Sequence, residues 1–257
     1  MTVLALAPAS QVPEGTLLAA PDAESVVARL LELGDAENVL VVATDRAGLE
    51  AARAARLVLG GEGLGVLHHP VPPTASFVAL AALRMLPPVA LGLAPALLAA
   101  VAHDSRTAAL LSSVSALDTP RPSMSLDLAS RLPGSVFRVD WTAQTVARAE
   151  SIDLPAGIAA VTTASERPVR EVDAAAWGPT QIQLETDGAF WGAKRWFEAT
   201  VLLRPLEETV GALLRPDVVA AAHRCASCGR HVAGELCVFC QIPVLSGAAP
   251  VHSGGHV

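Results

Sequence analysis

The chain has 257 residues, 52% of them hydrophobic and 17% charged, so it can bury a full-sized core. Its net charge of −7 gives no general attraction to a phosphate backbone and confines any nucleic-acid contact to a local patch. Lys194 is the single lysine and there is no tyrosine. This composition excludes a P-loop, which needs a lysine at a glycine-rich turn, and it excludes phenolic acid–base chemistry.

Helices and strands alternate through the first 165 residues. We expect helices at residues 22–34, 47–59, 77–86, 95–117, 126–132 and 143–150, and strands at residues 39–43, 65–68, 89–94, 136–141 and 157–162. This order predicts a Rossmann-like α/β fold, in which a parallel sheet carries flanking helices on both faces.

The most apolar run covers residues 85–102. Three prolines, Pro87, Pro88 and Pro95, interrupt it, which favours a buried strand and helix over a membrane span. The N-terminus has neither the basic residues nor the long apolar segment of an export signal. We therefore expect a cytoplasmic protein without a membrane span.

The alternation ends near residue 165. Residues 180–185 alternate polar and apolar side chains, Asp187-Gly188 is typical of a hairpin turn, and residues 190–203 favour β-structure. We expect an antiparallel hairpin here, followed by helices at 206–214 and 216–224.

The predicted hairpin and the residues just before it gather three of the chain's four tryptophans, Trp177, Trp191 and Trp196. Phe190, Trp191 and Trp196 lie within the hairpin, beside Lys194 and Arg195. An aromatic cluster of this kind either packs a hairpin onto the main body or offers a surface to a partner. We expect one face to pack and the other to bind a protein partner.

All four cysteines lie near the C-terminus, as the pairs Cys225–Cys228 and Cys237–Cys240. Two CxxC pairs at this spacing are typical of a tetrahedral Zn²⁺ site, and four thiolate ligands leave no open position for catalysis. A single redox pair would open a helix after a strand, and disulfides would need an oxidising compartment. His223 or His231 could replace one cysteine as a ligand.

Residues 224–241 resemble zinc ribbons and zinc knuckles. Cys228-Gly229 matches their CxxCG turn, whereas Gln241 stands where the second pair would have its glycine. The resemblance implies one structural Zn²⁺ per chain, held by all four cysteines.

A second candidate site follows the ends of predicted strands. Asp45, His68, His69 and Asp140 lie there, and in a parallel sheet the carboxyl ends of the strands meet at one edge. These side chains either converge in an acid–base pocket or serve as helix caps and loop surface. Residues 39–52 also resemble a segment of Toprim domains, the magnesium-dependent fold of primases and topoisomerases, although Ala43 replaces the first aspartate of the paired motif.

We expect four parts: a Rossmann-like domain (1–165), a hairpin with helices packed on it (166–222), a zinc ribbon (223–242) and a disordered tail (243–257). Because no complete catalytic motif is present, the sequence favours a non-catalytic interaction or assembly subunit with protein partners and structural zinc. The alternative is an enzyme or nucleic-acid-processing factor that uses the strand-end pocket.

Overall fold

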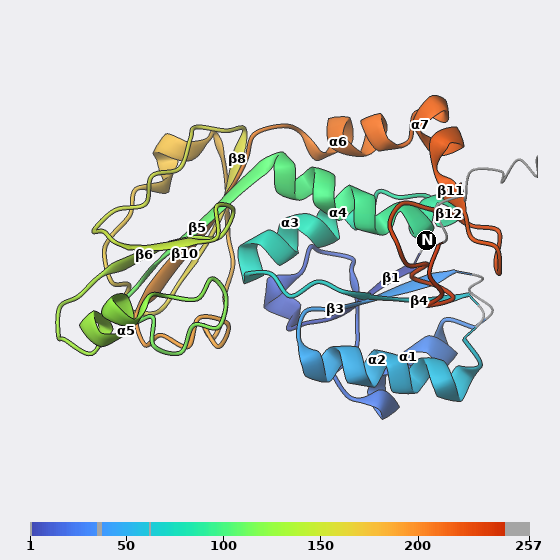
Figure 1. Cartoon of the computed structure of the whole chain (residues 1–257), viewed down its shortest axis with the longest axis horizontal. Helices are drawn as coiled ribbons and strands as arrows, with labels where there is room; N and C mark the ends of the chain where they lie inside the picture. The colour runs from blue at the N-terminus through green and yellow to red at the C-terminus, as the bar shows by residue number, and fades with distance from the viewer. Residues whose placement is uncertain (1, 35–37, 62, 245–257) are drawn as a thin grey trace, which may run out of the picture.

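The computed structural model describes residues 2–34, 38–61 and 63–244. It contains a four-stranded sheet covered by helices and a six-stranded sheet beside it, as Figure 1 shows. The predicted tail lies outside the described residues from residue 245 onward, and so do residues 35–37 of the loop before the first predicted strand.

The first sheet is parallel and has the order β2-β1-β3-β4. Its strands are β1 (Thr2–Leu6), β2 (Leu17–Leu18), β3 (Val39–Ala43) and β4 (Leu64–His68). Successive side chains of a strand point to opposite faces. Leu40 and Val42 therefore pack with α3 (Pro73–Leu83) and α4 (Ala94–His103), whereas Val41 packs with α1 (Ala23–Glu32) and α2 (Arg46–Leu59).

The second sheet is largely antiparallel and has the order β7-β6-β5-β10-β8-β9, with β8 and β9 parallel. Its strands are β5 (Ser105–Leu111), β6 (Phe137–Asp140), β7 (Thr145–Arg148), β8 (Ala159–Ala164), β9 (Thr180–Gln183) and β10 (Trp196–Leu202). A single residue, Asp104, separates α4 from β5, and β10 lies between β5 and β8. One continuous segment, α4 followed by β5, therefore runs from the first sheet's helices into the second sheet.

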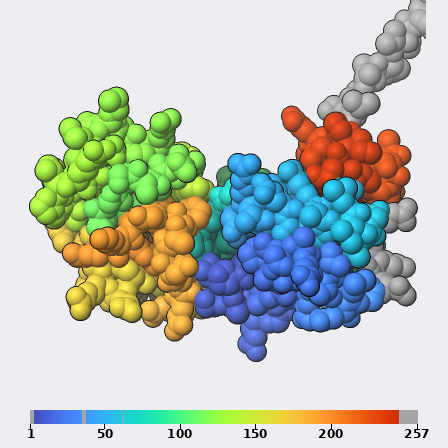
Figure 2. All heavy atoms as spheres, turned by 90° about the horizontal axis from the view of Figure 1, so that it is seen from below, coloured from blue at the N-terminus to red at the C-terminus, as the bar shows by residue number. Residues whose placement is uncertain are grey.

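The remaining elements are short. They are η1 (Ala9–Gln11), η2 (Pro88–Leu93), η3 (Ala174–Trp177), α5 (Met124–Ser130), α6 (Leu206–Leu213), α7 (Pro216–Ala221), β11 (His223–Arg224) and β12 (His231–Val232). α6 and α7 lead the chain from the second sheet back over α4 to the cysteine-rich segment (Figure 1). In the space-filling view this segment and the second sheet lie at opposite ends of the molecule (Figure 2).

The predicted fold class is confirmed: a parallel sheet with flanking helices is followed by a cysteine cluster. Three predicted elements are wrong. Residues 89–94 form the helix η2, residues 95–117 divide into α4 and β5, and residues 143–150 contain β7. Short segments of this kind fit either a helix or a strand, and for residues 105–111 pairing with the distant strand β10 decides the outcome.

The predicted hairpin is also wrong. β9 and β10 do not pair with each other, because both take β8 as their neighbour, on its two opposite edges. Trp191 and Trp196 are both buried in one cluster with β5 and β6, so neither offers a surface to a partner. Phe190, the third aromatic residue predicted at the partner surface, is 36% exposed.

Residues 85–102 form η2 and most of α4, and both contribute buried side chains to the core. Within residues 2–34, 38–61 and 63–244, no helix has both the length and the apolar character needed to cross a bilayer.

The cysteine-rich segment packs against the first sheet at β4. The Val66 N–H donates to the Val238 carbonyl oxygen at 2.9 Å, and the Gln241 amide donates to the Val66 carbonyl oxygen at 3.3 Å. Phe239 is 2% exposed and belongs to the same core cluster as α3 and α4. The segment therefore depends on the main body for much of its packing.

Gly92 in η2 provides a test of this packing. A Cβ at Gly92 would lie 2.1 Å from the His231 carbonyl oxygen of β12. We expect Gly92→Ala to lower the free energy of unfolding by about 2 kcal/mol or more, because backbone must move to relieve the clash. Gly211→Ala is the matched control: Gly211 lies in α6 with no atom near its added Cβ, and alanine there should stabilise by up to about 1 kcal/mol. Urea unfolding of both variants measures the difference, and equal effects would contradict the packing argument.

Candidate functional site

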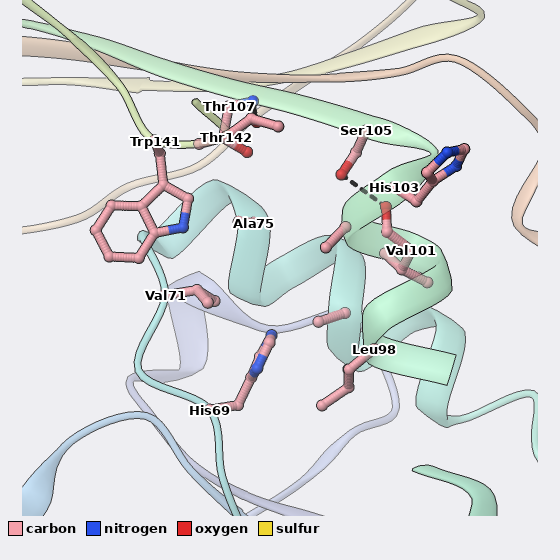
Figure 3. A pocket seen from close by; sticks show the side chains of 12 residues that line it. His69, Val71, Ala75, Leu98, Val101, His103, Ser105, Thr107, Trp141 and Thr142 are labelled. Carbon is pink, nitrogen blue, oxygen red and sulfur yellow. Dashed lines mark hydrogen bonds between the residues drawn. The ribbon is translucent and has the colours of Figure 1, made fainter. Parts of the chain in front are cut away.

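A cavity of about 360 Å³ lies where the helices of the first sheet meet the second sheet (Figure 3). α3, α4 and the loop after β4 form one side, and β5 with the end of β6 forms the other. Its lining residues are His69, Val71, Ala75, Ala79, Leu98, Val101, Ala102, His103, Ser105, Thr107, Trp141 and Thr142.

Small side chains on one face of α3 leave room for the cavity. Ala75 and Ala79 are four residues apart, so they lie on the same face of the helix, and both line the cavity. Leu98 and Val101 of α4 also line the cavity, and the Trp141 ring covers one end. The resulting walls are mainly hydrocarbon.

Four polar side chains also face the cavity. Ser105 donates to the Val101 carbonyl oxygen at 2.8 Å, a bond drawn in Figure 3. Thr142 Oγ1 accepts from the Thr107 N–H at 2.9 Å, and the structure shows no acceptor among the described residues for the Thr142 hydroxyl proton. Thr107 Oγ1 lies 2.8 Å from Thr200 Oγ1. His69 lies across the cavity from these groups (Figure 3).

Burial, reinforced by the neighbouring His68, lowers the pKa of His69 to about 4. The His69 ring is therefore neutral at pH 7, with one nitrogen as donor and the other as acceptor. A carboxylate that entered the cavity would favour the charged imidazolium and oppose this shift.

Beside the cavity, Glu198 of β10 is completely buried. Its Oε1 accepts from the Thr74 N–H at 2.7 Å and from the Thr74 hydroxyl at 2.5 Å, and its Oε2 accepts from Trp191 Nε1 at 2.6 Å. Thr74 lies in the first turn of α3, where backbone N–H groups lack helical partners and the helix dipole favours negative charge. The carboxyl group of Glu198, on β10, therefore caps the N-terminus of α3.

A row of threonine hydroxyls connects Glu198 with the cavity wall. Thr74 Oγ1 lies 2.7 Å from Thr200 Oγ1, which lies 2.8 Å from Thr107 Oγ1. Burial raises the pKa of Glu198 to about 7, although the hydrogen bonds from Thr74 and Trp191 favour the ionised form. Both protonation states of this carboxyl are therefore populated near neutral pH.

The strand-end residues do not form the predicted acid–base pocket. Asp45 caps α2 by accepting from the Gly48 N–H, and Asp140 accepts from the Ala143 N–H in a turn. His68 is exposed and, unlike His69, does not line the cavity. Of the four residues, only His69 lines the cavity, which is large enough for a small ligand.

Lys194 and Arg195 line a different cavity of about 570 Å³ at the other end of β5. Arg131 and Arg170 line it as well, and each forms an ion pair at 3.4 Å with Asp127 or Glu150. The Arg195 guanidinium donates to the carbonyl oxygens of residues 168 and 169. Arg195 therefore serves loop contacts in the second sheet.

The four cysteine sulfur atoms lie within 4.8 Å of one another. Cys228 Sγ and Cys237 Sγ are 3.7 Å apart. A tetrahedron with metal–sulfur bonds of about 2.3 Å has sulfur–sulfur edges of about 3.8 Å, so this separation fits one metal ion between the thiols. The cluster can hold a metal ion.

Both cysteine pairs end in the same left-handed turn. Gly229 has a φ of 69°, and Gln241 has a φ of 57° at the equivalent position. The Gly229 N–H donates to the Cys225 carbonyl oxygen and the Gln241 N–H to that of Cys237, each at 2.8 Å. The second turn thus forms without glycine, and the Gln241 side chain offsets part of the strain by donating to the Val66 and Val238 carbonyl oxygens.

Hydrogen bonds from Arg230 lower the pKa of Cys228 to about 6 against the opposing effect of burial. Burial and the neighbouring thiols raise the pKa of Cys240 to about 12. Four adjacent thiols cannot all ionise without a cation among them, and a bound metal ion supplies that charge.

No protein-family model matches the chain, and no curated protein matches it by sequence. Solved structures of DegV family proteins have a similar fold. One from Thermus thermophilus, for which fatty-acid binding is described, has a TM-score of 0.53 and 12% identity over 79% of this chain and 99% of that one. One from Corynebacterium glutamicum has a TM-score of 0.52 and 12% identity, covering 80% and 98% of the two chains.

A third DegV family protein, from Eubacterium eligens, is described as loaded with heptadecanoic acid. Its TM-score is 0.51 at 12% identity, and the match covers 79% of this chain and 100% of that one. These likenesses show that the main body has a DegV-type fold.

The comparisons correct two predictions. The chain was expected to be an interaction or assembly subunit with protein partners, or else an enzyme or nucleic-acid-processing factor. Two of the three solved structures above are instead described with fatty acids, which are small-molecule ligands. A lipid ligand could not be predicted from the sequence, because the cavity-lining residues come from segments far apart in the chain and carry no common motif.

The raised pKa of Glu198 makes stability depend on pH. A carboxyl whose pKa is higher in the folded state stabilises the fold below its unfolded value of about 4.5, and this contribution is lost as the pH rises through about 7. We expect a loss of about 3 kcal/mol between pH 4.5 and pH 8. His69 acts in the opposite direction, since its lowered pKa removes stability as the pH falls from 6.5 towards 4.

Urea unfolding of the wild type and of Glu198→Gln at pH 5 and pH 8 isolates the Glu198 contribution. The glutamine variant should lack the decline between pH 5 and pH 8, while the effect of His69 is common to both proteins. Parallel pH profiles would show that Glu198 titrates normally.

Proposed function

We propose that this protein binds one fatty acid, with the acyl chain in the cavity between α3, α4 and β5. The observation that carries the proposal is the cavity itself: it has mainly hydrocarbon walls, a few polar groups and a volume within the usual range for small ligands. The DegV-type fold supports it, because structures of this fold are described with fatty acids.

The acyl chain would pack along Ala75 and Ala79 and against Leu98 and Val101. Burying apolar surface contributes about 25 cal/mol per Å², so an alkyl chain gains most of its affinity from such walls. The small side chains of α3 leave room for it without distortion of the helix.

The carboxyl group would lie between His69 and the hydroxyls of Thr107 and Thr142. A neutral imidazole and a hydroxyl proton without another acceptor can both donate to a carboxylate oxygen. Groups that fix the orientation of a ligand are few in such sites, and two or three donors suffice.

We also propose that Cys225, Cys228, Cys237 and Cys240 hold one Zn²⁺ in a structural role. The sulfur positions support a tetrahedral ion, and four thiolates leave no coordination position for substrate. Zinc and iron both accept such a set of ligands, so the identity of the metal requires direct measurement.

Filling the cavity tests the binding proposal. Ala75→Leu places a larger side chain in the proposed path of the acyl chain with little change in helix propensity. We expect palmitate affinity, measured by displacement of a fluorescent fatty acid, to fall at least tenfold. Ala99→Leu is the matched control, since Ala99 is exposed on α4 and does not line the cavity. The proposal is wrong if palmitate does not bind the wild type, or if Ala75→Leu and Ala99→Leu bind it equally well.

Metal removal tests the zinc proposal. Elemental analysis should find about one Zn²⁺ per chain in a colourless protein. Because Cys225, Cys237, Val238 and Phe239 share a core cluster with α3 and α4, chelation should lower the melting temperature of the whole chain. Cys228→Ser should have the same effect, whereas iron with visible absorbance would refute the assignment to zinc.

A further inference from the structure

Glu198 is the one fully buried carboxyl group among the described residues, and fatty-acid binding as proposed above does not use it directly. It lies next to the cavity wall. Three threonine hydroxyls lie between Glu198 and the cavity, and each oxygen is within 2.8 Å of the next.

The direction of these hydrogen bonds follows from the number of protons. A hydroxyl has one proton to donate, and an ionised carboxylate can only accept. When Glu198 is ionised, Thr74 must donate to it, Thr200 must then donate to Thr74, and Thr107 must donate to Thr200. Thr107 then offers only lone pairs to the cavity.

Protonation of Glu198 allows the opposite direction. The carboxylic acid can donate to Thr74, Thr74 to Thr200, and Thr200 to Thr107. The Thr107 hydroxyl proton is then free to donate into the cavity. The Thr74 N–H and Trp191 Nε1 still donate to the two carboxyl oxygens in either state.

We propose that Glu198 is a positioning residue for the ligand: through the hydroxyls of Thr74, Thr200 and Thr107, it couples binding of a carboxylate in the cavity to uptake of one proton. This inference rests on the proposed function and extends it. A carboxylate beside Thr107 is repelled by its lone pairs and attracted by its hydroxyl proton, so it binds more tightly to the form in which Glu198 is protonated, whereas His69 and Thr142 can donate to it in both forms. A neutral head group, such as that of an alcohol, can donate or accept and binds both forms.

The surroundings of Glu198 add few other charges. The sequences of α3 and β8 contain none, and β5 contributes Arg106, whose guanidinium donates to the carbonyl oxygens of residues 103 and 105. The loop that carries Trp191 also has four exposed charged residues, Glu185, Asp187, Lys194 and Arg195. Within the cavity wall, His69 and His103 can titrate as well, and the His103 side chain is 85% exposed.

Decanoate and decanol are the probes. Decanoate stays ionised between pH 6 and pH 8, because an ordinary carboxyl has a pKa near 4.3. With a Glu198 pKa of about 7, the protonated fraction falls about tenfold over this range, and decanoate affinity measured by calorimetry should fall about tenfold with it. Decanol affinity should change by less than about twofold.

The variants identify the route of the coupling. Thr200→Val removes the central hydroxyl, so the pH dependence of decanoate binding should shrink to less than about twofold, and Thr200→Ser should restore it. Thr163→Val is the matched control: Thr163 is buried on β8, opposite Glu198 in register, and its hydroxyl has no hydrogen-bond partner in the described part of the chain. Thr163→Val and His103→Gln should both keep the tenfold dependence.

Thermal unfolding confirms that each variant is folded, and Thr107→Val serves in place of Thr200→Val if the latter is not. A tenfold dependence that persists in the valine variant would overturn the coupling and leave fatty-acid binding intact. So would tight decanoate binding by the wild type without pH dependence. Absence of decanoate binding at pH 6 would overturn the proposed function, and the inference with it.

Discussion

The junction of the two sheets depends on one buried carboxyl group. Glu198 lies on β10, between β5 and β8 in the second sheet, and its oxygens accept from the first turn of α3, which packs on the first sheet. A buried carboxyl without partners is costly, and here three N–H and O–H donors satisfy it. The same contact holds α3 in the place where Ala75 and Ala79 border the cavity.

Much of the first half of the fold could be predicted from local patterns. The unbroken apolar run at residues 39–43 and the capped helix after it mark a strand–helix unit, and the structure contains β3 and α2 there. β1 was missed, because its five residues carry an apolar pattern that fits an N-terminal strand no better than a loop. Its place in the sheet comes from pairing with β3, which is 33 residues further along the chain.

The second sheet shows the limit of local reasoning more clearly. Residues 105–111 continue the apolar character of α4, and the sequence contains no proline or glycine at the boundary to end the helix. They form β5 because β10 and β6 supply hydrogen-bonding partners on both sides. Such non-local pairing overrides weak local preference, and it cannot be read from one segment alone.

The two candidate sites differ in how far the sequence predicts them, for the same reason. The cysteine cluster lies within 16 residues, so its spacing alone indicates the geometry. The cavity draws on segments from residue 69 to residue 142, and the hydroxyl row behind it reaches residue 200. Of these residues, only His69 was a candidate site residue in the sequence. It was expected in a pocket with Asp45, His68 and Asp140, none of which lines the cavity.

The packing of Val238 and Gln241 against β4 has a consequence for the behaviour of the chain in the cell. β4 is the last strand of its sheet, so its outer backbone groups would otherwise be open to strands of other molecules. Under the metal binding proposed above, the ion would hold this covering segment in shape. A chain without the metal would then leave the β4 edge open to pairing with strands of other molecules.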